Sequence, residues 1–392
     1  MTGLDAHGFR LPAYGGGALA DVLPAVVAAA GVTSPDLPRT SLELPDGEHW
    51  VVVLVDGLGM QLLQDHPRDA PFLTDVLAAA GSATGGGSGG TVVRTLTAGV
   101  PSTTATSLTS LGTGLVPGRH GVVGYTSRVP GTDTLLNALK WDADVDPHDW
   151  QPHRTALGLA ADAGMHVTVA DKREFAGSGL SVAAFRGARR LDADDVDEQV
   201  DGALAAHREA GTSPSLTYLY LNDVDHTGHG KGVDSPAWRT ALSGVDDTLD
   251  RLREELPDHV RLLVTADHGM LDVPVDRRIE VGDLPELSDG VRRLGGEARL
   301  RHLYCAEGAA HDVAETWADT LGDRAVVRVR EEVADWFGGI DEAVTERIGD
   351  VVVAARDDWA VLSAEQFPLE TRMVGFHGSL TPVEMDVPLV VC

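Results

Sequence analysis

The sequence predicts an α/β protein built on a doubly wound, mainly parallel sheet, and two observations support that prediction. Short apolar runs at residues 50–55, 216–221 and 261–266 are typical of strands that are buried on both faces of a parallel sheet. Helical patterns alternate with these runs, as the crossover connections between parallel strands require. We therefore expect helices on both faces of one central sheet.

The other expected elements of this sheet follow in chain order. A helix is expected at residues 18–31, weakened or kinked at Pro24, and further helices follow the first strand through Leu63 and at residues 72–80, 155–164, 193–209 and 238–255. Additional strands are expected at residues 91–96 and 166–170. The glycine-rich residues 81–90 are interpreted as a flexible loop, because they lack the lysine and the following serine or threonine of a phosphate-binding P-loop.

The pattern of the chain changes between about residues 273 and 350. Strands are expected there at residues 298–305 and 325–329, with a helix at residues 310–321 between them. This block has the size of a small inserted α/β subdomain, so we expect residues 1–392 to form one domain that carries this insertion. Residues 351–354 and 387–391 are expected to be edge strands.

The charge balance restricts the partners of the protein. The chain has 60 acidic and 31 basic residues, which gives a formal net charge of −29. A nucleic-acid polymer or an anionic membrane surface would be repelled, so we expect neither as a partner. A small phosphate ester remains compatible, because a bound divalent cation would dominate the local field.

The cysteines and apolar segments restrict the class of protein further. Cys305 and Cys392 are the two cysteines, which is too few for a disulfide framework or a thiolate metal site. Residues 1–17 do not place an apolar run after a charged segment, and no apolar run is long enough to span a bilayer. We therefore expect no signal peptide and a cytoplasmic location.

Four segments with acidic or histidine side chains follow, or lie near, predicted strands or the C-terminus. They contain Asp56, the pair Asp225 and His229, the pair Asp267 and His268, and His377. Acidic residues at the carboxyl ends of buried strands lie where open α/β sheets place their sites. Carboxylate and imidazole ligands together suit zinc or a similar transition ion. Any one segment is a weak signal, because a single Asp-His pair is usually a turn or a cap.

A hydroxyl-rich segment covers residues 99–114 and begins a short helical pattern. Pro101 suits the turn before a helix, and Ser102 or Thr103 could cap its first N–H groups. A hydroxyl at a helix N-terminus lies in a positive field, beside backbone donors that can hold a phosphate oxygen. Taken alone, the segment favours a capping cluster in a polar loop.

Taken together, these motifs resemble those of a known family. Asp56-Gly57, residues 101–114, Asp225-x-x-Gly-His229, Asp267-His268-Gly269-Met270 and Gly375-x-His377-Gly378 resemble the metal and nucleophile motifs of the alkaline phosphatase superfamily. The greatest similarity is to its type I phosphodiesterase/nucleotide pyrophosphatase branch. The motifs stand in the expected order over residues 51–378, and their combination is far more specific than any one of them.

The resemblance implies a two-zinc site and a nucleophile. Thr104 aligns with the threonine nucleophile of that branch. One zinc ion would be held by Asp225, His229 and His377, and the other by Asp56, Asp267 and His268 with the hydroxyl of Thr104 as a fourth neighbour. Each ion would keep an open position for substrate or water, as catalytic metals require.

The implied function is hydrolysis of a phosphodiester or nucleotide pyrophosphate bond through a phospho-threonine intermediate. The implied partner is a small phosphate ester or a nucleotide. A phosphomonoesterase and a phosphonate hydrolase would use the same six ligands, so both stay open. A catalytically silent metal-binding scaffold is the alternative outside the enzymes, and a third hypothesis is that the acidic residues only solvate the surface.

Two further positions bear on substrate binding. Tyr125 follows His120-Gly121-Val122-Val123-Gly124, where the family places an asparagine that helps hold a phosphate oxygen. Tyr125 either replaces that function or packs against the wall of the site. Lys172 follows a predicted strand and either reaches a substrate phosphate or forms a surface ion pair with Asp171 or Glu174.

Overall fold

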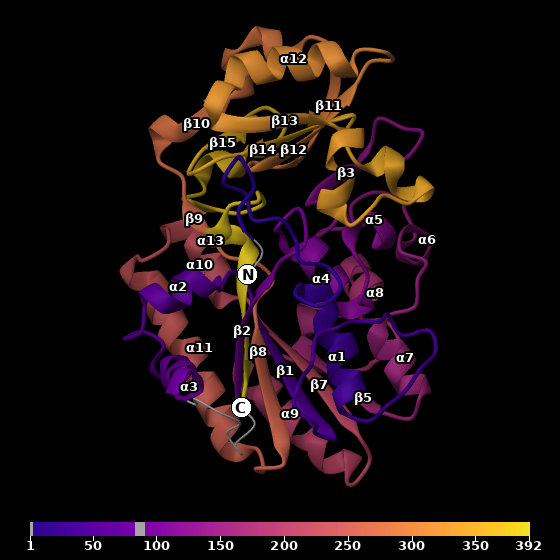
Figure 1. Ribbon diagram of the computed structural model, residues 1–392, viewed down its shortest axis with the longest axis vertical. Helices are drawn as coiled ribbons and strands as arrows, with labels where there is room; N and C mark the ends of the chain where they lie inside the picture. The colour runs from indigo at the N-terminus through magenta and orange to yellow at the C-terminus, as the bar shows by residue number, and fades with distance from the viewer. Residues whose placement is uncertain (1–2, 83–90) are drawn as a thin grey trace.

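The computed structural model describes residues 3–82 and 91–392, and its centre is a seven-stranded sheet (Figure 1). The strands lie in the order β2-β17-β8-β1-β7-β5-β6. All of them run in one direction except β17, which is antiparallel to both of its neighbours. The strands are β1 (His49–Val55), β2 (Val92–Thr97), β5 (His166–Lys172), β6 (Arg189–Ala193), β7 (Ser215–Leu221), β8 (Val260–Thr265) and β17 (Asp386–Val391). The predicted doubly wound, mainly parallel sheet is confirmed.

Helices cover both faces of this sheet (Figure 1). One face carries α2 (Met60–Asp65), α3 (Pro71–Ser82), α9 (Val196–Ala210), α10 (Asp223–Lys231) and α11 (Pro236–Glu255). The other face carries α1 (Val22–Ala29), α4 (Thr104–Thr113), α7 (Ala156–Asp162) and α8 (Gly179–Phe185). Every residue of β1 and β7 is buried between these layers, as their apolar sequences predict.

Side-chain caps set the starts of several helices. Ser235 Oγ accepts a hydrogen bond from the N–H of Trp238 at 3.2 Å and begins α11. Thr155 Oγ1 accepts from the N–H of Gly158 at 2.9 Å and begins α7. These caps satisfy N–H groups that have no partner within the helix, so the helix boundaries follow local sequence chemistry.

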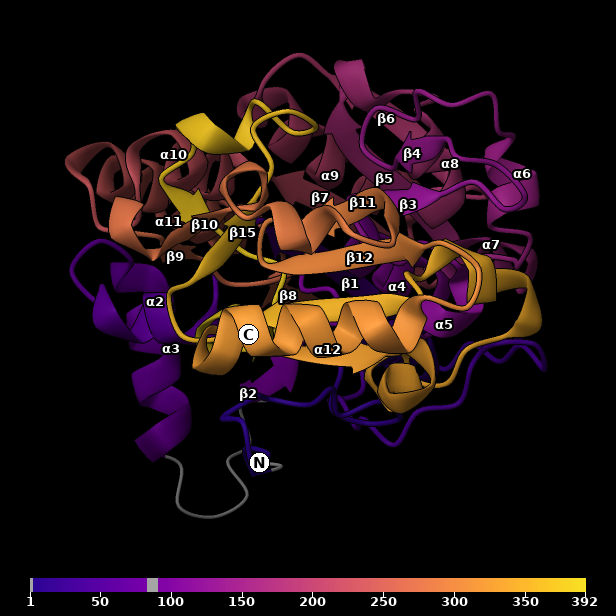
Figure 2. The same cartoon turned by 90° about the horizontal axis from the view of Figure 1, so that it is seen from above.

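A second sheet lies above the carboxyl edge of the first (Figure 1). It has the antiparallel order β11-β12-β14-β13. Its strands are β11 (Val291–Glu297), β12 (Leu300–Cys305), β13 (Ala325–Val329) and β14 (Val351–Ala355). Figure 2 shows α12 (Ala310–Leu321) lying along this sheet. Trp317 and Leu321 of α12 are buried in a hydrophobic cluster formed with these strands.

Short elements connect the two sheets. The structure has α5 (Pro117–His120), α6 (Pro147–Trp150) and α13 (Pro382–Met385). Paired short strands are β3 (Thr126–Arg128) with β4 (Leu135–Asn137), β9 (Leu271–Asp272) with β16 (Gly375–Phe376), and β10 (Arg278–Glu280) with β15 (Ala360–Leu362). The region after Gly124 contains the small hairpin formed by β3 and β4.

Several predicted elements were wrong in position. Residues 387–391 are not an edge strand, because β17 lies between β2 and β8. Residues 351–354 are not an edge strand either, because β14 pairs with β12 on one side and β13 on the other. Both strands are almost entirely apolar and buried, which fits an interior position.

Three boundaries also differ from the prediction. Residues 189–193 form the strand β6, so the helix expected from residue 193 begins at Val196. Pro24 does not kink α1, because it lies in the first turn, where its missing N–H would have had no partner within the helix. Residues 81–82 end α3, and residues 83–90 of the expected loop lie outside the described residues.

The lengths and compositions of the helices bear on membrane insertion. Within residues 3–82 and 91–392, no helix combines the length and the apolar character that a bilayer crossing demands. The cytoplasmic location stays a prediction.

Candidate metal centre

The carboxyl ends of three adjacent parallel strands bring the acidic motifs together. Strands β8, β1 and β7 are neighbours in the sheet. Asp56 directly follows β1, Asp267 follows β8 by two residues, and α10 with Asp225 begins just after β7. The Asp56 N–H also donates to the carbonyl oxygen of Leu221 at 2.9 Å, which fixes the turn against β7. The topology alone therefore gathers these carboxylates at one edge.

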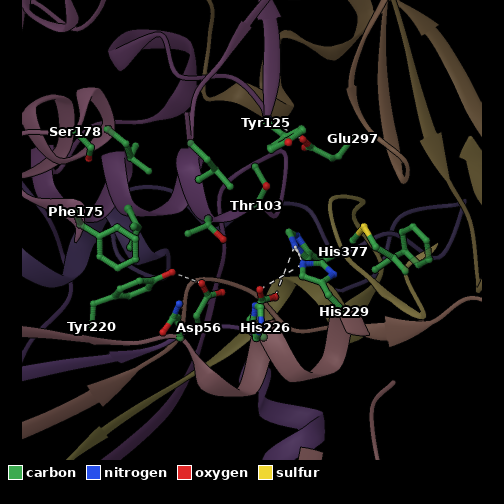
Figure 3. Close-up of a pocket in the computed structure, with 18 of the residues that line it drawn as sticks. Asp56, Thr103, Tyr125, Phe175, Ser178, Tyr220, His226, His229, Glu297 and His377 are labelled. Atoms are coloured by element: carbon green, nitrogen blue, oxygen red, sulfur yellow. Dashed lines mark hydrogen bonds and ion pairs between the residues drawn. The ribbon is translucent and has the colours of Figure 1, made fainter. Parts of the chain in front are cut away.

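A first donor cluster consists of Asp225, His229 and His377. Asp225 and His229 are four residues apart on α10 and so share one face of the helix, with 3.3 Å between Asp225 Oδ2 and His229 Nε2. His377 follows β16, and its Nε2 lies 3.3 Å from His229 Nε2 and 3.8 Å from Asp225 Oδ1. Donor atoms of all three residues lie within 4.8 Å of one another, and Figure 3 shows His229 and His377 side by side.

A second donor cluster surrounds the Nε2 atom of His268. Asp56 Oδ1 lies 3.4 Å from it, Asp267 Oδ2 lies 3.3 Å from it, and Thr104 Oγ1 lies 3.3 Å from it. Donor atoms around a tetrahedral zinc ion lie about 3.4 Å apart when each is about 2.1 Å from the metal. The distances of 3.3–3.4 Å from His229 Nε2 and from His268 Nε2 to their neighbours are close to such an edge.

The two clusters are adjacent. Donor atoms of Asp56, Asp225 and His268 also lie within 4.8 Å of one another, although Asp225 belongs to the first cluster. Two cations held in these clusters would share one pocket, which is the arrangement that two-metal hydrolysis requires.

All three histidines turn the same kind of nitrogen toward the clusters. The Nδ1 atoms of His229, His268 and His377 lie 2.8, 3.0 and 2.9 Å from the carbonyl oxygens of Gly375, Gly269 and Ser102. A carbonyl oxygen can only accept, so each Nδ1 carries the proton and each Nε2 presents its lone pair. This backbone support is the pattern that orients metal-binding histidines.

The buried carboxylates need positive charge. Burial raises the pKa of Asp225 to about 7, and it raises the pKa values of Asp56 and Asp267 as well. Burial also lowers the pKa of His268 to about 4, so the histidine supplies no compensating charge at neutral pH. Among the residues that the structure describes, Asp56 Oδ1, Asp225 Oδ1 and Asp267 Oδ2 are buried without a hydrogen-bond partner. Divalent cations fit these atoms.

The hydroxyl-rich segment connects the ligand segments. Ser102 Oγ donates to the carbonyl of Ser379 at 2.6 Å and accepts from the N–H of Gly378 at 3.2 Å, next to His377. Ser107 Oγ donates to the carbonyl of Asp267 at 2.8 Å. The expected capping role is wrong, because α4 starts after Thr103 with no side-chain cap. These hydroxyls are used instead for bonds to other parts of the chain.

A pocket of about 400 Å³ opens over the two clusters. Its lining includes the apolar side chains Leu108, Phe175, Leu180 and Phe185, and the polar side chains at its floor include Asp56, Thr104, Asp225, His229 and His377. No lysine or arginine lines this pocket within the described part of the chain. Asp267 and His268 lie beneath this floor and are fully buried.

The two positions expected to bind substrate differ in placement. Tyr125 lines the pocket (Figure 3), and its backbone N–H donates to Glu297 Oε2 at 2.8 Å. Lys172 does not line the pocket, and its ammonium group donates to Asn222 Oδ1 at 2.6 Å. Over the described residues, Lys172 forms no ion pair with Asp171 or Glu174, so the expected surface pair is wrong.

The structure also shows functional candidates that sequence reasoning missed. The phenol of Tyr220 donates to Asp56 Oδ2 and so fixes the Asp56 carboxylate (Figure 3). A tyrosine inside a buried strand was a signal that could have been used, because its hydroxyl needs a partner. Glu297 also reaches the pocket, from the end of β11, and no motif marked it.

Outside the clusters, His120 is buried and both ring nitrogens are engaged. Its Nε2 lies 2.9 Å from Ser110 Oγ, and its Nδ1 accepts from the N–H of Val122 at 3.2 Å. Asp223 and His226 are exposed on α10, beside the ligand pair. These placements keep His120, Asp223 and His226 outside the two donor clusters.

The doubly wound sheet carries a carboxylate and histidine centre at its carboxyl edge, as the resemblance to the alkaline phosphatase superfamily leads us to expect. The model of the type I phosphodiesterase/nucleotide pyrophosphatase family matches residues 50–380, and the chain belongs to that family. The chain is therefore grouped with hydrolases that act on phosphoric ester bonds.

Curated relatives match over limited segments. Human ectonucleotide pyrophosphatase/phosphodiesterase family member 7 is 42% identical over 76 residues, which are 18% of this chain and 16% of that protein. Human family member 5 is 24% identical over 169 residues, which are 42% of this chain and 34% of that protein. The matched segments thus span well under half of either relative.

Solved structures share the fold over most of the chain. Murine ectonucleotide pyrophosphatase/phosphodiesterase 5 superposes with a TM-score of 0.68 at 21% identity, covering 87% of both chains. Phosphonoacetate hydrolase from Sinorhizobium meliloti 1021, in complex with phosphonoformate, superposes with a TM-score of 0.66 at 20% identity and 92% coverage of both chains. At these identities the likeness concerns the fold.

Proposed function

We propose that this protein is a two-zinc phosphodiesterase that hydrolyses phosphodiester or nucleotide pyrophosphate bonds through a phospho-threonine intermediate. The observation that carries the proposal is the position of Thr104 Oγ1, 3.3 Å from His268 Nε2 within the second donor cluster. Membership of the phosphodiesterase family supports the same reaction class.

Asp225, His229 and His377 would hold one zinc ion, and Asp56, Asp267 and His268 would hold the other beside Thr104. Bound divalent ions supply charge stabilisation for the phosphoryl oxygens and favour deprotonation of a nearby hydroxyl or water. The lone pairs that the three histidines direct into the clusters support this assignment.

The chain's own residues perform the displacement. Thr104 Oγ attacks phosphorus, its bond to phosphorus forms as the bond to the leaving alkoxide breaks, and the leaving oxygen takes up a proton. Water then attacks the phospho-threonine and releases the phosphate product, which restores the Thr104 hydroxyl. Thr104 is the first residue of α4, so unpaired N–H groups of the first turn are available to a non-bridging oxygen.

Tyr125 and Lys172 act on substrate binding in different ways. The Tyr125 side chain lies in the pocket wall, where its phenol can donate one hydrogen bond to a substrate oxygen. Lys172 acts indirectly, since its ammonium group holds Asn222, and Asn222 lines the pocket. Neither side chain would supply a positive charge inside the pocket.

The charge of the pocket favours a diester over a monoester or a phosphonate. A phosphodiester carries one negative charge at neutral pH, whereas a monoester approaches two, and a carboxylated phosphonate adds another anionic group. Within the described residues the pocket offers no lysine or arginine for such extra charge. A monoanionic diester is therefore the better match.

The same pocket supports one catalytic domain with an inserted subdomain at about residues 273–350. Glu297 and Ala298, from the second sheet, line the pocket together with residues of the first sheet. The site would then need both parts, and the insertion would form one wall of it.

The proposal is tested with zinc-loaded protein and two chromogenic substrates, bis(p-nitrophenyl) phosphate and p-nitrophenyl phosphate. The expected result is faster hydrolysis of the diester and loss of activity in Thr104→Ala. Thr109→Ala is the matched control, because Thr109 Oγ1 is buried in the same helix and donates to the carbonyl of Ala105 at 2.8 Å. Preference for the monoester would favour a phosphatase, and zinc binding without hydrolysis would favour a silent scaffold.

A further inference from the structure

Glu297 places a carboxyl group in the pocket from a part of the chain that the family motifs do not cover. It is the last residue of β11 and is 7% exposed. Figure 3 shows Glu297 beside Tyr125 on one side of the pocket, with Phe175 on the other side. Its Cγ would lie 2.5 Å from a Cβ on Gly378, so it packs directly against the loop that carries His377.

The side chain of Glu297 is fixed in one orientation. Its Oε2 accepts from the N–H of Tyr125 at 2.8 Å. A second hydrogen bond joins the adjacent residues of the two segments, because Thr126 Oγ1 donates to the carbonyl of Gly296 at 2.9 Å. These two bonds hold the carboxyl group in the wall before any ligand arrives.

The other oxygen, Oε1, is buried and has no hydrogen-bond partner among the described residues. The remaining carboxyl groups of the wall are already engaged. Asp171 accepts from the N–H of Lys172 at 2.8 Å, and Glu370 accepts from the guanidinium of Arg301. Among these carboxyl groups of the wall, Glu297 is therefore the one with a buried oxygen that accepts no hydrogen bond. Burial of such an oxygen costs free energy unless a ligand donates a hydrogen bond to it.

The protein itself does not supply the missing partner. Arg301 is the cation that influences Glu297, but its guanidinium is held by Glu370 and by the carbonyl of Val361. Glu297 does not belong to either group of residues that could hold a metal ion. Burial raises the pKa of Glu297 to about 8, so the empty pocket favours the neutral acid, and a donor from the substrate would favour the carboxylate.

We propose that Glu297 is a specificity-determining residue whose Oε1 accepts a hydrogen bond from a hydroxyl or ammonium group on the alcohol portion of a phosphodiester substrate. This inference rests on the proposed function and names its substrate class: phosphodiesters of donor-bearing alcohols, such as amino alcohols or polyols. An apolar alcohol of the same size leaves Oε1 without a partner.

The test uses three p-nitrophenyl phosphodiesters of equal size, with 3-aminopropyl, 3-hydroxypropyl or n-butyl as the second ester group. The wild-type protein is expected to show at least tenfold higher kcat/KM for one or both donor-bearing esters than for the butyl ester. Glu297→Gln keeps an oxygen for the Tyr125 N–H. If the wild type prefers the aminopropyl ester, this variant is expected to lower kcat/KM tenfold or more for that ester and less than threefold for the butyl ester.

Two variants of Glu297 distinguish a preference for a hydroxyl group from a preference for an ammonium group. Glu297→Gln spares a hydroxyl preference, because its amide nitrogen can donate to a substrate hydroxyl oxygen while its amide oxygen accepts from the Tyr125 N–H, whereas Glu297→Leu removes both preferences. Glu370→Gln is the matched control, because it changes a carboxyl of the same wall that Arg301 already occupies. It is expected to change the rates on all three esters by the same factor.

Binding of the same esters to Thr104→Ala protein, measured by calorimetry, tests Glu297 without depending on turnover. Equal affinity for all three esters, or an equal loss for all three in Glu297→Gln, would overturn the assignment of Glu297. Absence of hydrolysis by the wild type, with discrimination retained in binding, would contradict the proposed function and leave the role of Glu297 supported.

Discussion

At the residue scale, the two oxygens of the Asp56 carboxylate face different side chains. Its Oδ1 lies in the second donor cluster, 3.4 Å from His268 Nε2, and its Oδ2 accepts from the phenol of Tyr220. The phenol therefore fixes the direction in which Oδ1 points. Groups that hold a metal ligand in this way commonly contribute about 10–100-fold to metal affinity.

Removing the phenol tests this role. Tyr220→Phe is expected to weaken zinc binding by about 10–100-fold, because Asp56 loses the donor that orients it. Affinity is measured by competition with a chromogenic chelator. Tyr218→Phe is the matched control, since Tyr218 is buried in the same strand and its hydroxyl has no hydrogen-bond partner among the described residues. Equal affinity in both variants would contradict the prediction.

The candidate ligands could be located residue by residue from the sequence, but the side chains that support them could not. Asp56, Asp225 and Asp267 stand at ends of apolar runs, so one sequence pattern indicates both the strand and the site. Tyr220 and Glu297 approach through tertiary structure, from positions with no motif. Lys172 shows the same limit, because the partner of its ammonium group, Asn222, lies fifty residues away in the chain.

At the scale of elements, the segment before α4 links parts of the site. Ser102 holds the backbone at Gly378 and Ser379, and its own carbonyl accepts from Nδ1 of His377. The Ser102 N–H also donates to the carbonyl of Gly378 at 3.2 Å, so this serine makes four hydrogen bonds with the loop that carries the candidate metal ligand His377. The orientation of His377 depends on this short stretch as much as on its own strand.

The Ser102 hydroxyl is buried, so its loss should be measurable. Ser102→Ala is expected to lower the free energy of unfolding by about 1–3 kcal/mol, because the Gly378 N–H and the Ser379 carbonyl lose their partner. Denaturant unfolding of the zinc-free protein measures the change. Thr113→Ala serves for comparison, since Thr113 Oγ1 donates within its own helix to the carbonyl of Thr109. An equal or larger loss there would show that the serine has no special role.

Element prediction succeeded where burial and sequence agree. Strands β1, β7 and β8 are continuous apolar runs, and each was predicted almost to the residue. Strand β6 was missed, because its sequence RRLDA is mostly polar and its pairing with β5 at the sheet edge decides its structure. Strands β14 and β17 were recognised, but their neighbours in the sheets come from distant segments that a linear pattern does not contain.

At the scale of the whole molecule, buried ion pairs connect the second sheet to the body of the protein. Arg299, next to β12, donates to both carboxylate oxygens of Glu384 in α13, at 2.6 and 2.8 Å. Both side chains are fully buried. Glu384 Oε1 also accepts from the N–H of Ser379 at 3.0 Å, so the pair extends to the loop after His377.

Removing one partner of this ion pair should lower the stability of the fold substantially. Arg299→Met is expected to lower the free energy of unfolding by about 3–5 kcal/mol, because Glu384 remains buried without its cation. The double variant Arg299→Met/Glu384→Gln is expected to recover part of that loss. Urea unfolding of each protein provides the measurement, with Arg251→Met at an exposed ion pair as the control that leaves stability unchanged. A loss no larger than that of the control would contradict the prediction.

Strand β17 has a consequence for the order of folding during synthesis. The strand is made after residue 385, yet it lies between β2 and β8, second from one edge of the first sheet. Until it leaves the ribosome, the edge of β8 has no neighbour on that side and exposes backbone groups that can pair with other chains. His377, a candidate metal ligand, is made only shortly before β17. On a nascent chain, the sheet therefore closes only after β2, β8 and all the candidate metal ligands have been made.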